Sequence, residues 1–360
     1  MIFIFYFGSD SGFNGDCMKV AMYYNNNDVR LEEMPMPVLM HDELMFRVMA
    51  CGICGSDVLE WYRIKKAPLV LGHEATGVIE ETGNKVQKYK KGDRVFITHH
   101  VPCNTCRYCL RGSHTACDTL HSTKFYPGGF AEYVRVPAIN IDRGIYPLPD
   151  DMSFEDATFI EPLACVARGQ RLARISAGDT VLVMGSGISG LLHIQLARSL
   201  GAANIIATDI SEPRMNAAKL FGANAVIDAK GSVDMATRVR EANDGRQADK
   251  VIVCVGNHAV ARQALQCVDN GGTVLYFAVP KPGEDVPVDM NRMWKNEVTL
   301  MTSYGAAPND LQTSLDMIRS GAVNVNDMIT HRLPLTETGN GFRLFAAGGE
   351  TMKVIIEPHK

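Results

Sequence analysis

The chain has 360 residues, of which 46% are hydrophobic and 21% are charged, and this composition excludes a largely disordered protein. Its length is enough for two domains that fold without disulfide staples. Acidic residues outnumber basic residues by 40 to 36, and the net charge of −4 gives no general attraction to nucleic acid or anionic lipid. No apolar run approaches the roughly 20 residues that span a bilayer, so we expect a soluble globular protein without a nucleic-acid or membrane partner.

The chain begins with an apolar segment, residues 1–8, that has neither the basic start nor the small-residue cleavage site of an export signal. Met18, rather than Met1, is predicted to be the natural start, because residues 19–24 have the composition of a first strand. The ten cysteines include closely spaced groups, which in a chain of this length indicate metal binding rather than disulfides. Together these features predict a cytoplasmic location.

From about residue 18 to residue 150, short segments of alternating polarity are separated by glycine turns. Strands are predicted at residues 44–49, 77–80 and 94–97. Because this half is poor in long helical patterns, it predicts a small barrel-like β domain.

The pattern changes after Pro162, where buried strands begin to alternate with helical segments. This alternation predicts βαβ units with a parallel sheet. The predicted strands lie at 180–184, 204–208, 225–227, 250–254 and 272–276, and the helices at 191–200, 213–221 and 259–268.

The last part of the chain has one more predicted helix, residues 310–320, followed by a β-like tail at 352–357 that resembles the first half. We therefore predict an α/β nucleotide-binding domain, residues 166–304. It would be inserted into a discontinuous β domain made of residues 18–165 and 305–360.

Four cysteines lie within fifteen residues: Cys103, Cys106, Cys109 and Cys117. Four thiolates form a closed tetrahedral set without an open position, which is typical of a structural zinc. Four unrelated core cysteines are the weaker interpretation, because the residues between them are polar. A nucleic-acid zinc module is also disfavoured, because it would have two separated cysteine pairs and a basic stripe.

A second group offers ligands of a different kind. Cys54 and His73 lie beside glycines, and together with one carboxylate they would leave a fourth position for water or substrate, as in a catalytic zinc site. Glu74 follows His73 directly, whereas Glu161 lies where the β domain passes to the nucleotide domain and is predicted to face the cleft. Both acids remain candidates for the third ligand. Cys51 is interpreted as a small buried residue rather than as the redox partner of Cys54.

The segment Gly185-Ser-Gly187-Ile188-Ser189-Gly190 has the G-x-G-x-x-G spacing of a dinucleotide-binding turn, after a predicted strand and before a helix. The first glycine permits the turn, the second lets a pyrophosphate approach, and the helix start presents free N–H groups to it. Asp209, 19 residues later, is predicted to bind the adenosine ribose and to disfavour the 2′-phosphate of NADP. Arg214 lies close by and would soften this preference for NAD.

Together these motifs resemble the zinc-containing medium-chain dehydrogenase/reductase family, which includes alcohol, sorbitol, threonine and butanediol dehydrogenases. The resemblance covers nearly all of residues 19–358, with the motifs in the order GICGSD, GHE, the four cysteines, GGFAEY, EPL and GSGISG. It implies a GroES-like β-barrel catalytic domain with an inserted Rossmann domain, NAD as cofactor, and one catalytic and one structural zinc. It further implies a homodimer or homotetramer that acts on a small alcohol or ketone.

The resemblance also implies roles for individual residues. Cys54, His73 and either Glu161 or Glu74 would hold the catalytic zinc, and the four cysteines of the second group would hold the structural zinc. Ser56 matches the hydroxyl that passes the alcohol proton outward. Asp57 matches a residue that supports the zinc ligands from behind.

The Glu161-Pro-Leu segment resembles the polyol and butanediol branch, since the primary-alcohol branch places a cysteine in this region and threonine dehydrogenases usually have Asp-Pro-Phe. We therefore expect reversible hydride transfer from a secondary alcohol (a polyol, cyclitol or vicinal diol) to NAD. The alternatives are an amino alcohol or a primary alcohol as substrate, and a non-catalytic protein that binds NAD and zinc.

The sequence departs from sorbitol-type enzymes at two places. Leu59 stands where they tend to have a histidine, and residues 303–304 stand where they have a polyol-binding arginine. Residues 61–63 could either shape the substrate site or cover the β domain. His99 and His100 are interpreted as partly exposed loop residues rather than as substrate contacts.

Overall fold

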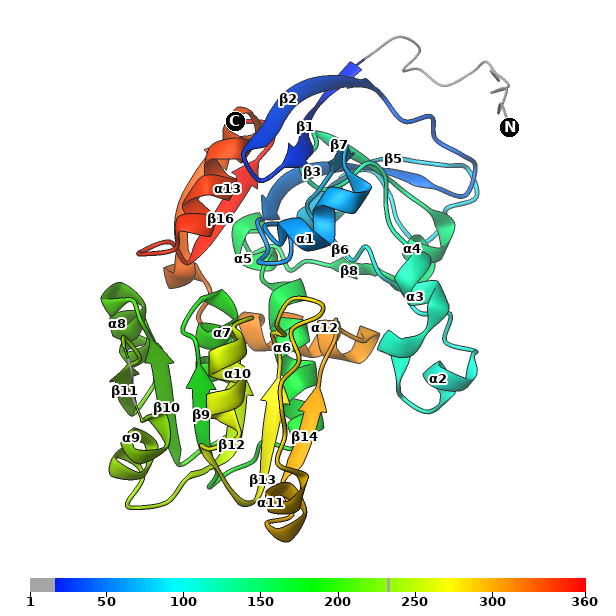
Figure 1. The fold of residues 1–360 in the computed structure, drawn as a ribbon. Helices are drawn as coiled ribbons and strands as arrows, with labels where there is room; N and C mark the ends of the chain where they lie inside the picture. Colours follow the sequence, from blue (N-terminus) through cyan, green and yellow to red (C-terminus); the bar gives the residue numbers. More distant parts are fainter. Residues whose placement is uncertain (1–16, 232–233) are drawn as a thin grey trace.

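The computed structural model describes residues 17–231 and 234–360 (Figure 1). Residues 1–8, including Met1 as the alternative to the predicted start at Met18, lie outside this range. Met18 lies within it, buried in strand β1.

The β domain contains a small antiparallel sheet and a larger mixed sheet. The small sheet has the order β2-β1-β4, with β1 (Cys17–Asn25), β2 (Asp28–Pro35) and β4 (Leu69–Val70). The larger sheet has the order β15-β16-β3-β5-β6-β8, and β7 also pairs with β3. Its strands are β3 (Leu44–Gly52), β5 (Glu74–Thr82), β6 (Arg94–Ile97), β7 (Tyr133–Val136), β8 (Ile145–Pro147), β15 (Ile329–Pro334) and β16 (Lys353–Glu357).

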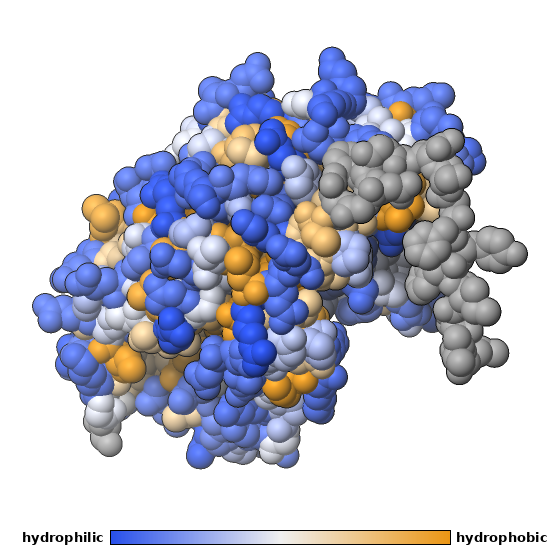
Figure 2. All heavy atoms as spheres, turned by 90° about the horizontal axis from the view of Figure 1, so that it is seen from above, coloured by the Kyte–Doolittle hydropathy of each residue, from blue (hydrophilic) through white to orange (hydrophobic). Residues whose placement is uncertain are grey.

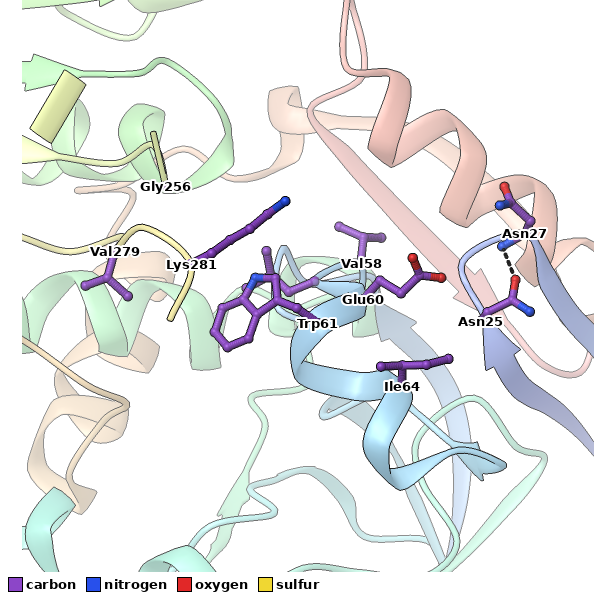
Figure 3. Close-up of a pocket in the computed structure, with 10 residues that line it drawn as sticks. Asn25, Asn27, Val58, Glu60, Trp61, Ile64, Gly256, Val279 and Lys281 are labelled. Atoms are coloured by element: carbon purple, nitrogen blue, oxygen red, sulfur yellow. Dashed lines mark hydrogen bonds between the residues drawn. The ribbon is translucent and has the colours of Figure 1, made fainter. Parts of the chain in front are cut away.

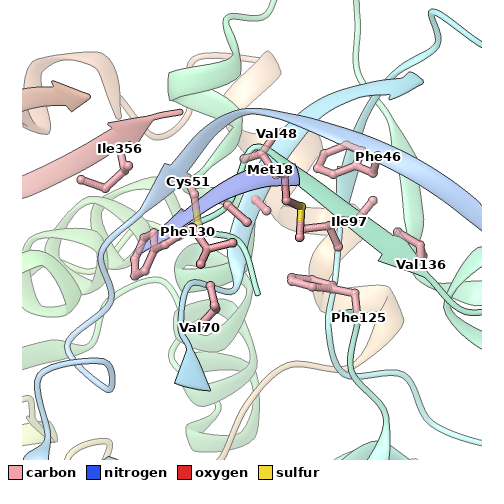
Figure 4. Close-up of a cluster of buried hydrophobic side chains, with 14 of the residues drawn as sticks. Met18, Phe46, Val48, Cys51, Val70, Ile97, Phe125, Phe130, Val136 and Ile356 are labelled. Carbon is pink, nitrogen blue, oxygen red and sulfur yellow. The ribbon is translucent and has the colours of Figure 1, made fainter. Parts of the chain in front are cut away.

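The two C-terminal strands complete this sheet. The C-terminal β16 pairs antiparallel with β3, where Ile356 opposes Cys51. Side chains from both sheets then fill one apolar core, in which Phe46, Ile97 and Phe130 are almost fully buried (Figure 4). The tail therefore belongs to the β domain, as its alternating sequence predicts.

Short helices and turns connect these strands. They are α1 (Glu60–Arg63), α2 (Arg107–Leu110), α3 (Asp118–Ser122), α4 (Ala138–Arg143), α5 (Phe154–Ala157) and α13 (Thr338–Ala347), with 3-10 turns η1 (Ile64–Lys66), η2 (His114–Ala116), η3 (Asn326–Met328) and η4 (Leu335–Glu337). In Figure 1, α2 and α3 stand out from the body of the β domain as a separate lobe.

The nucleotide domain is a parallel sheet with the order β11-β10-β9-β12-β13-β14. The order reverses between β9 and β12, which is the arrangement of a dinucleotide-binding fold. Figure 1 shows its strands pointing toward the β domain, so their carboxyl ends line the junction. The strands are β9 (Thr180–Met184), β10 (Asn204–Asp209), β11 (Ala225–Asp228), β12 (Ala248–Val253), β13 (Val268–Tyr276) and β14 (Thr299–Thr302).

Helices cover both faces of this sheet, and β9 is consequently buried along its whole length. They are α7 (Ile188–Ser199), α8 (Glu212–Leu220), α9 (Met235–Ala242), α10 (His258–Ala264) and α11 (Met290–Lys295). The predicted helix at 259–268 is too long. It ends at Ala264, because Ala248 N–H donates to the carbonyl of Cys267 and Val268 already pairs with Ala248 in the sheet.

Two helices join the domains. Helix α6 (Ile160–Ala173) leaves the β domain and runs beside the parallel sheet, and α12 (Pro308–Arg319) packs against it. The proposed boundary at 165/166 falls inside α6, whereas the one at 304/305 falls in the loop before α12. Among the described residues, no helix is long and apolar enough to cross a membrane. The face seen in Figure 2 is mostly hydrophilic, with hydrophobic residues in small separate groups.

Candidate active site

The four-cysteine lobe gathers its thiols into one cluster. The ligand atoms of Cys103, Cys106, Cys109 and Cys117 all lie within 4.8 Å of one another. Backbone N–H groups of Thr105 and Cys106 donate to Cys103 and lower its pKa to about 5, which favours the thiolate that binds metal. The lobe buries only a few apolar side chains of its own, so a bound ion would supply much of its stability.

A second cluster lies where β3 and β5 meet. Cys54 follows β3, His73 precedes β5, and Glu74 is the first residue of β5. Their Sγ, imidazole nitrogen and carboxylate oxygen lie within 4.8 Å of one another. His73 and Glu74 are buried, whereas Cys54 is half-buried.

Asp57 contacts two members of this cluster, Cys54 and His73. Its fully buried carboxylate accepts the N–H of Cys54 (3.1 Å) and lies 3.4 Å from His73 Nδ1 and 3.3 Å from Arg63 Nη2. Burial alone would raise the pKa of Asp57, but His73 and Arg63 outweigh it and lower the pKa. Burial alone would lower the pKa of His73, yet Asp57 and Cys54 raise it well above its ordinary value.

Glu74 forms an ion pair with Lys353, the first residue of β16. Both residues are almost completely buried, at 1% and 0% exposure, and Lys353 Nζ lies 5.1 Å from the centre of the Phe159 ring. Gly52 makes room for the pair, because a Cβ there would overlap both Glu74 Oε2 and the end of Lys353. Lys353 was not among the residues predicted for the site.

Glu161, the second residue of α6, lies near this cluster but is not one of the three close ligands. Cys165, one turn later, donates its thiol to Glu161 Oε1 at 3.4 Å. Burial raises the pKa of Glu161, partly offset by His73. The structure therefore brings Cys54, His73 and Glu74 together and leaves Glu161 beside them.

Ser56 is held by an arginine. Arg63 Nη2 donates to Ser56 Oγ (2.9 Å) and Arg63 Nε donates to the Ser56 carbonyl (2.9 Å), while the guanidinium carbon lies 4.8 Å from the centre of the Tyr62 ring. Of residues 61–63, Arg63 thus belongs to the site. Leu59 is exposed and supplies no polar group in place of the missing histidine.

The two loop histidines pack beside His73 of the second cluster. The His99 ring lies 4.9 Å from His73 and 3.7 Å from His100, centre to centre. Both are half-buried, and burial lowers the pKa of His100 to about 4. Both histidines are partly exposed, as predicted from the sequence. They also lie next to the second cluster, because the His99 ring packs beside His73.

The dinucleotide turn has the geometry that its spacing predicts. Gly185 has φ +99°, and a Cβ on Gly190 would overlap the Gly185 carbonyl, so both positions require glycine. Helix α7 begins at Ile188, followed by Ser189, and so presents its free N–H groups here. Beside Gly187 the nearest group to an added Cβ is Arg214 Nη1, 4.0 Å away.

Asp209 ends β10 next to this turn and is mostly buried. Its carboxylate accepts the N–H groups of Ser186 (2.8 Å), Ile210 (2.8 Å) and Ser211 (2.9 Å). These bonds fix the acid at the strand end, where lone pairs remain for a ribose hydroxyl.

An open pocket of about 840 Å³ lies between the domains. It is lined by Val58 and Trp61 from the β domain and by Gly256, Val279 and Lys281 from the loops after β12 and β13 (Figure 3). In Figure 3, Lys281 reaches across toward Val58. Ligands of parallel sheets bind at this edge, outside the carboxyl ends of the strands.

Comparisons with known proteins agree with this architecture. Residues 40–150 match the alcohol dehydrogenase GroES-like domain and residues 189–320 match the zinc-binding dehydrogenase domain. Sorbitol dehydrogenase of Bacillus subtilis is 29% identical over 353 residues (95% of this chain, 98% of the relative), and a probable D-xylulose reductase A of Aspergillus clavatus is 34% identical over 335 residues (89% and 92%).

Solved structures give the same result. A putative zinc-binding dehydrogenase from Sinorhizobium meliloti, bound to NADP, superposes with a TM-score of 0.84 at 29% identity and covers 95% of this chain and 100% of that chain. The predicted fold, a GroES-like domain with an inserted Rossmann domain, is thereby confirmed. The chain belongs to the zinc-containing medium-chain dehydrogenase family, in its polyol branch.

Proposed function

We propose that the protein oxidises a secondary alcohol (a polyol, cyclitol or vicinal diol) by reversible hydride transfer to NAD. The observation that carries this proposal is the buried Cys54–His73–Glu74 cluster, because a thiolate, an imidazole and a carboxylate within 4.8 Å suit a zinc ion with one open position. The cluster lies beside α6, the helix that joins the two domains, since Glu74 begins β5 and β5 contacts α6.

In this proposal Cys54, His73 and Glu74 hold the catalytic zinc, with Glu161 as the alternative third ligand. Asp57 supports the site by orienting the imidazole of His73 and the backbone of Cys54. A zinc ion in this set supplies Lewis acidity, which lowers the pKa of the substrate hydroxyl. Cys103, Cys106, Cys109 and Cys117 hold a second, structural zinc.

Ser56 receives the proton that the alcohol releases. One lone pair of its Oγ is occupied by Arg63, which leaves one lone pair and the hydroxyl proton for exchange. Arg63 cannot accept a proton at ordinary pH and Leu59 has no titratable group. Neither side chain can therefore take the proton onward, and it would leave Ser56 to solvent.

We infer NAD rather than NADP from Asp209, whose carboxylate is fixed at the end of β10 where a 2′-phosphate would meet it. The turn residues Gly185, Gly187, Ile188, Ser189 and Gly190 bind the pyrophosphate. Arg214 lies beside Gly187, and its buried Nε has no hydrogen-bond partner among the described residues. It would bind a phosphate and so reduce the preference for NAD over NADP.

The test is the initial rate of NAD reduction, with NADP in parallel, on sorbitol, xylitol, inositol, 2,3-butanediol, threonine and a primary alcohol. A preference for one secondary alcohol is expected. Cys54→Ser and His73→Ala should abolish turnover while NAD still binds, whereas the exposed Cys17→Ser is the matched control. Turnover that survives either substitution would remove this cluster from the chemistry.

Two further features belong to the proposal. A homodimer or homotetramer is supported by β14, which ends the parallel sheet and has no ladder partner on its outer side in the described part of the chain. Light scattering of the purified protein tests it. A cytoplasmic location is supported by the ten free cysteines.

A further inference from the structure

Helix α6 carries polar residues on one face beyond Glu161. Cys165 and Arg168 follow Glu161 at spacings of four and seven residues, which places all three on the same side of the helix. Helical side chains lean toward the N-terminus, so Arg168 leans toward the turn of α6 that carries Cys165. Seven residues correspond to about 10 Å along the helix axis.

Arg168 is buried, but most of its hydrogen-bond donors have no acceptor among the described residues. Only 6% of its surface is exposed, yet within the described residues its Nε and Nη1 have no hydrogen-bond partner. Its Nη2 donates to Thr115 Oγ1 at 3.0 Å, which ties α6 to the four-cysteine lobe. Two of the three nitrogens of this buried guanidinium, which carry three N–H groups, therefore have no acceptor among the described residues, although buried donors are normally paired.

The nearest acid forms an ion pair with Arg168 but does not hydrogen-bond to its guanidinium. Asp310 Oδ2 lies 3.9 Å from Arg168 Nη1, too far for a hydrogen bond. The Asp310 carboxylate is occupied by others: Arg171 donates to Oδ1 through Nε (3.1 Å) and Nη2 (2.9 Å), and the Ala307 N–H donates to Oδ2 (3.0 Å). Burial lowers the pKa of Arg168, opposed by Asp310. Two arginines thus share one carboxylate, and Arg168 is the less satisfied of them.

The four-cysteine lobe and the loop after β14 meet beside Arg168. A Cβ on Gly305 would lie 3.8 Å from Thr115 Cγ2, so the loop after β14 approaches the lobe here. In that loop Ser303 Oγ is buried and, among the described residues, also lacks a partner. Tyr304 stacks against His121 of the lobe, with ring centres 5.4 Å apart. Lobe, loop and α6 therefore enclose one polar region.

We propose that Arg168 binds an oxyanion, a carboxylate or a phosphate, at the end of the substrate remote from the reacting carbon. The inference rests on the proposed function and narrows its substrate to acidic or phosphorylated polyols. The planar guanidinium offers the two parallel N–H donors that such groups bind. Glu161 and Arg168 at opposite ends of one helix face would fit a chain of roughly four to six carbons between carbinol and anion, at about 1.5 Å per bond.

The experiment compares three alcohols of one skeleton: sorbitol, gluconate and sorbitol 6-phosphate. The ratio of kcat/KM for an anionic alcohol to that for sorbitol is measured in wild type, Arg168→Gln and Arg168→Lys. We expect Arg168→Gln to lower this ratio about 10- to 100-fold, mainly through KM, and Arg168→Lys to restore part of it. The gluconate and phosphate arms identify which oxyanion is preferred.

Arg171→Gln is the matched control, because it removes the other arginine of the Asp310 pair and should leave the ratio unchanged. Equal losses on anionic and neutral alcohols in Arg168→Gln would make Arg168 a structural tether and overturn the inference. A wild-type protein that prefers sorbitol would overturn it as well, even if Arg168→Gln does not fold.

Calorimetric titration of the zinc-loaded wild type and Arg168 variants with gluconate and with inorganic phosphate separates the two proposals. Binding that depends on Arg168 without any turnover would leave the oxyanion site standing while the dehydrogenase function fails. Turnover of neutral polyols without oxyanion binding would support the dehydrogenase function and overturn the oxyanion site.

Discussion

Replacing Lys353 with methionine removes the cation from the buried pair with Glu74 and keeps the aliphatic stem near Phe159. Lys353 is completely buried and Glu74 is 1% exposed, so water cannot take over the lost contact. Removing one partner of a buried ion pair leaves an uncompensated charge and costs about 3–5 kcal/mol. We therefore expect the free energy of unfolding of the metal-free protein to fall by about this amount.

The assay is denaturant unfolding of wild type, Lys353→Met, Glu74→Gln and the double variant, with and without zinc. The double variant should lose less than the sum of the single variants, because a neutral amide needs no cation. Zinc should reduce the loss in Lys353→Met, since a metal bound by Glu74 would compensate the carboxylate.

The control is Lys360→Met. Lys360 pairs with Glu357 at the surface, where its side chain is 64% exposed, and such pairs contribute about 0–1 kcal/mol. A loss in Lys353→Met no larger than in this control would refute the argument, and so would additive losses in the double variant.

Three further predictions follow from single residues. Asp209→Asn keeps the side-chain shape but removes the charge, and it should shift the NAD-to-NADP ratio of kcat/KM about tenfold toward NADP; an unchanged ratio would mean that Asp209 only fixes the turn. Burial lowers the pKa of His193 to about 3, so between pH 6.5 and 3 the unfolded chain binds a proton that the folded chain does not, and stability falls with falling pH. His193→Gln should remove this slope of about 1.4 kcal/mol per pH unit in denaturant titrations. Cys117→Ser should release one of two zinc ions per chain, measured by metal analysis, and the release of both would contradict two independent clusters.

Features encoded by short spacings were predictable from the sequence. The four cysteines and the glycine turn each lie within fifteen residues, and ligand geometry or backbone geometry dictates their spacing. The strands of the nucleotide domain were also predictable, since burial on both faces gives continuous apolar runs such as residues 180–184. The predicted end of the helix at 268 was wrong, because pairing with β12, not local propensity, decides where β13 begins.

Features encoded by tertiary contacts were not predictable. Lys353 lies 279 residues from Glu74 and reads locally as one residue of an apolar strand, so only strand pairing reveals the pair. In the sequence Arg168 is an ordinary helical residue, and only the fold shows that two nitrogens of its buried guanidinium have no hydrogen-bond acceptor among the described residues. Arg63 was among the residues that the sequence left open at 61–63, and its contact with Ser56, seven residues earlier across a turn, shows that it lies beside the cluster.

The two acids that the sequence left as alternatives differ in what else binds them. Glu74 pairs with the Lys353 ammonium, whereas burial raises the pKa of Glu161 and the Cys165 thiol donates to it. A metal must displace any proton from its ligand, so the raised pKa of Glu161 makes it the weaker candidate, and Glu74 is the acid that lies with Cys54 and His73.

This argument predicts different metal contents for two variants. Glu161→Gln should keep two zinc ions per chain, while the double variant Glu74→Gln/Lys353→Met should keep only the one in the four-cysteine lobe. The double variant is used because Glu74→Gln alone would leave Lys353 unpaired and confound metal loss with misfolding. Anomalous scattering at the zinc edge should then place a Glu74 oxygen about 2.0–2.2 Å from the metal in the wild type. Loss of zinc in Glu161→Gln instead would assign the third ligand to α6, and the ion pair with Lys353 would be what holds Glu74 back from the metal.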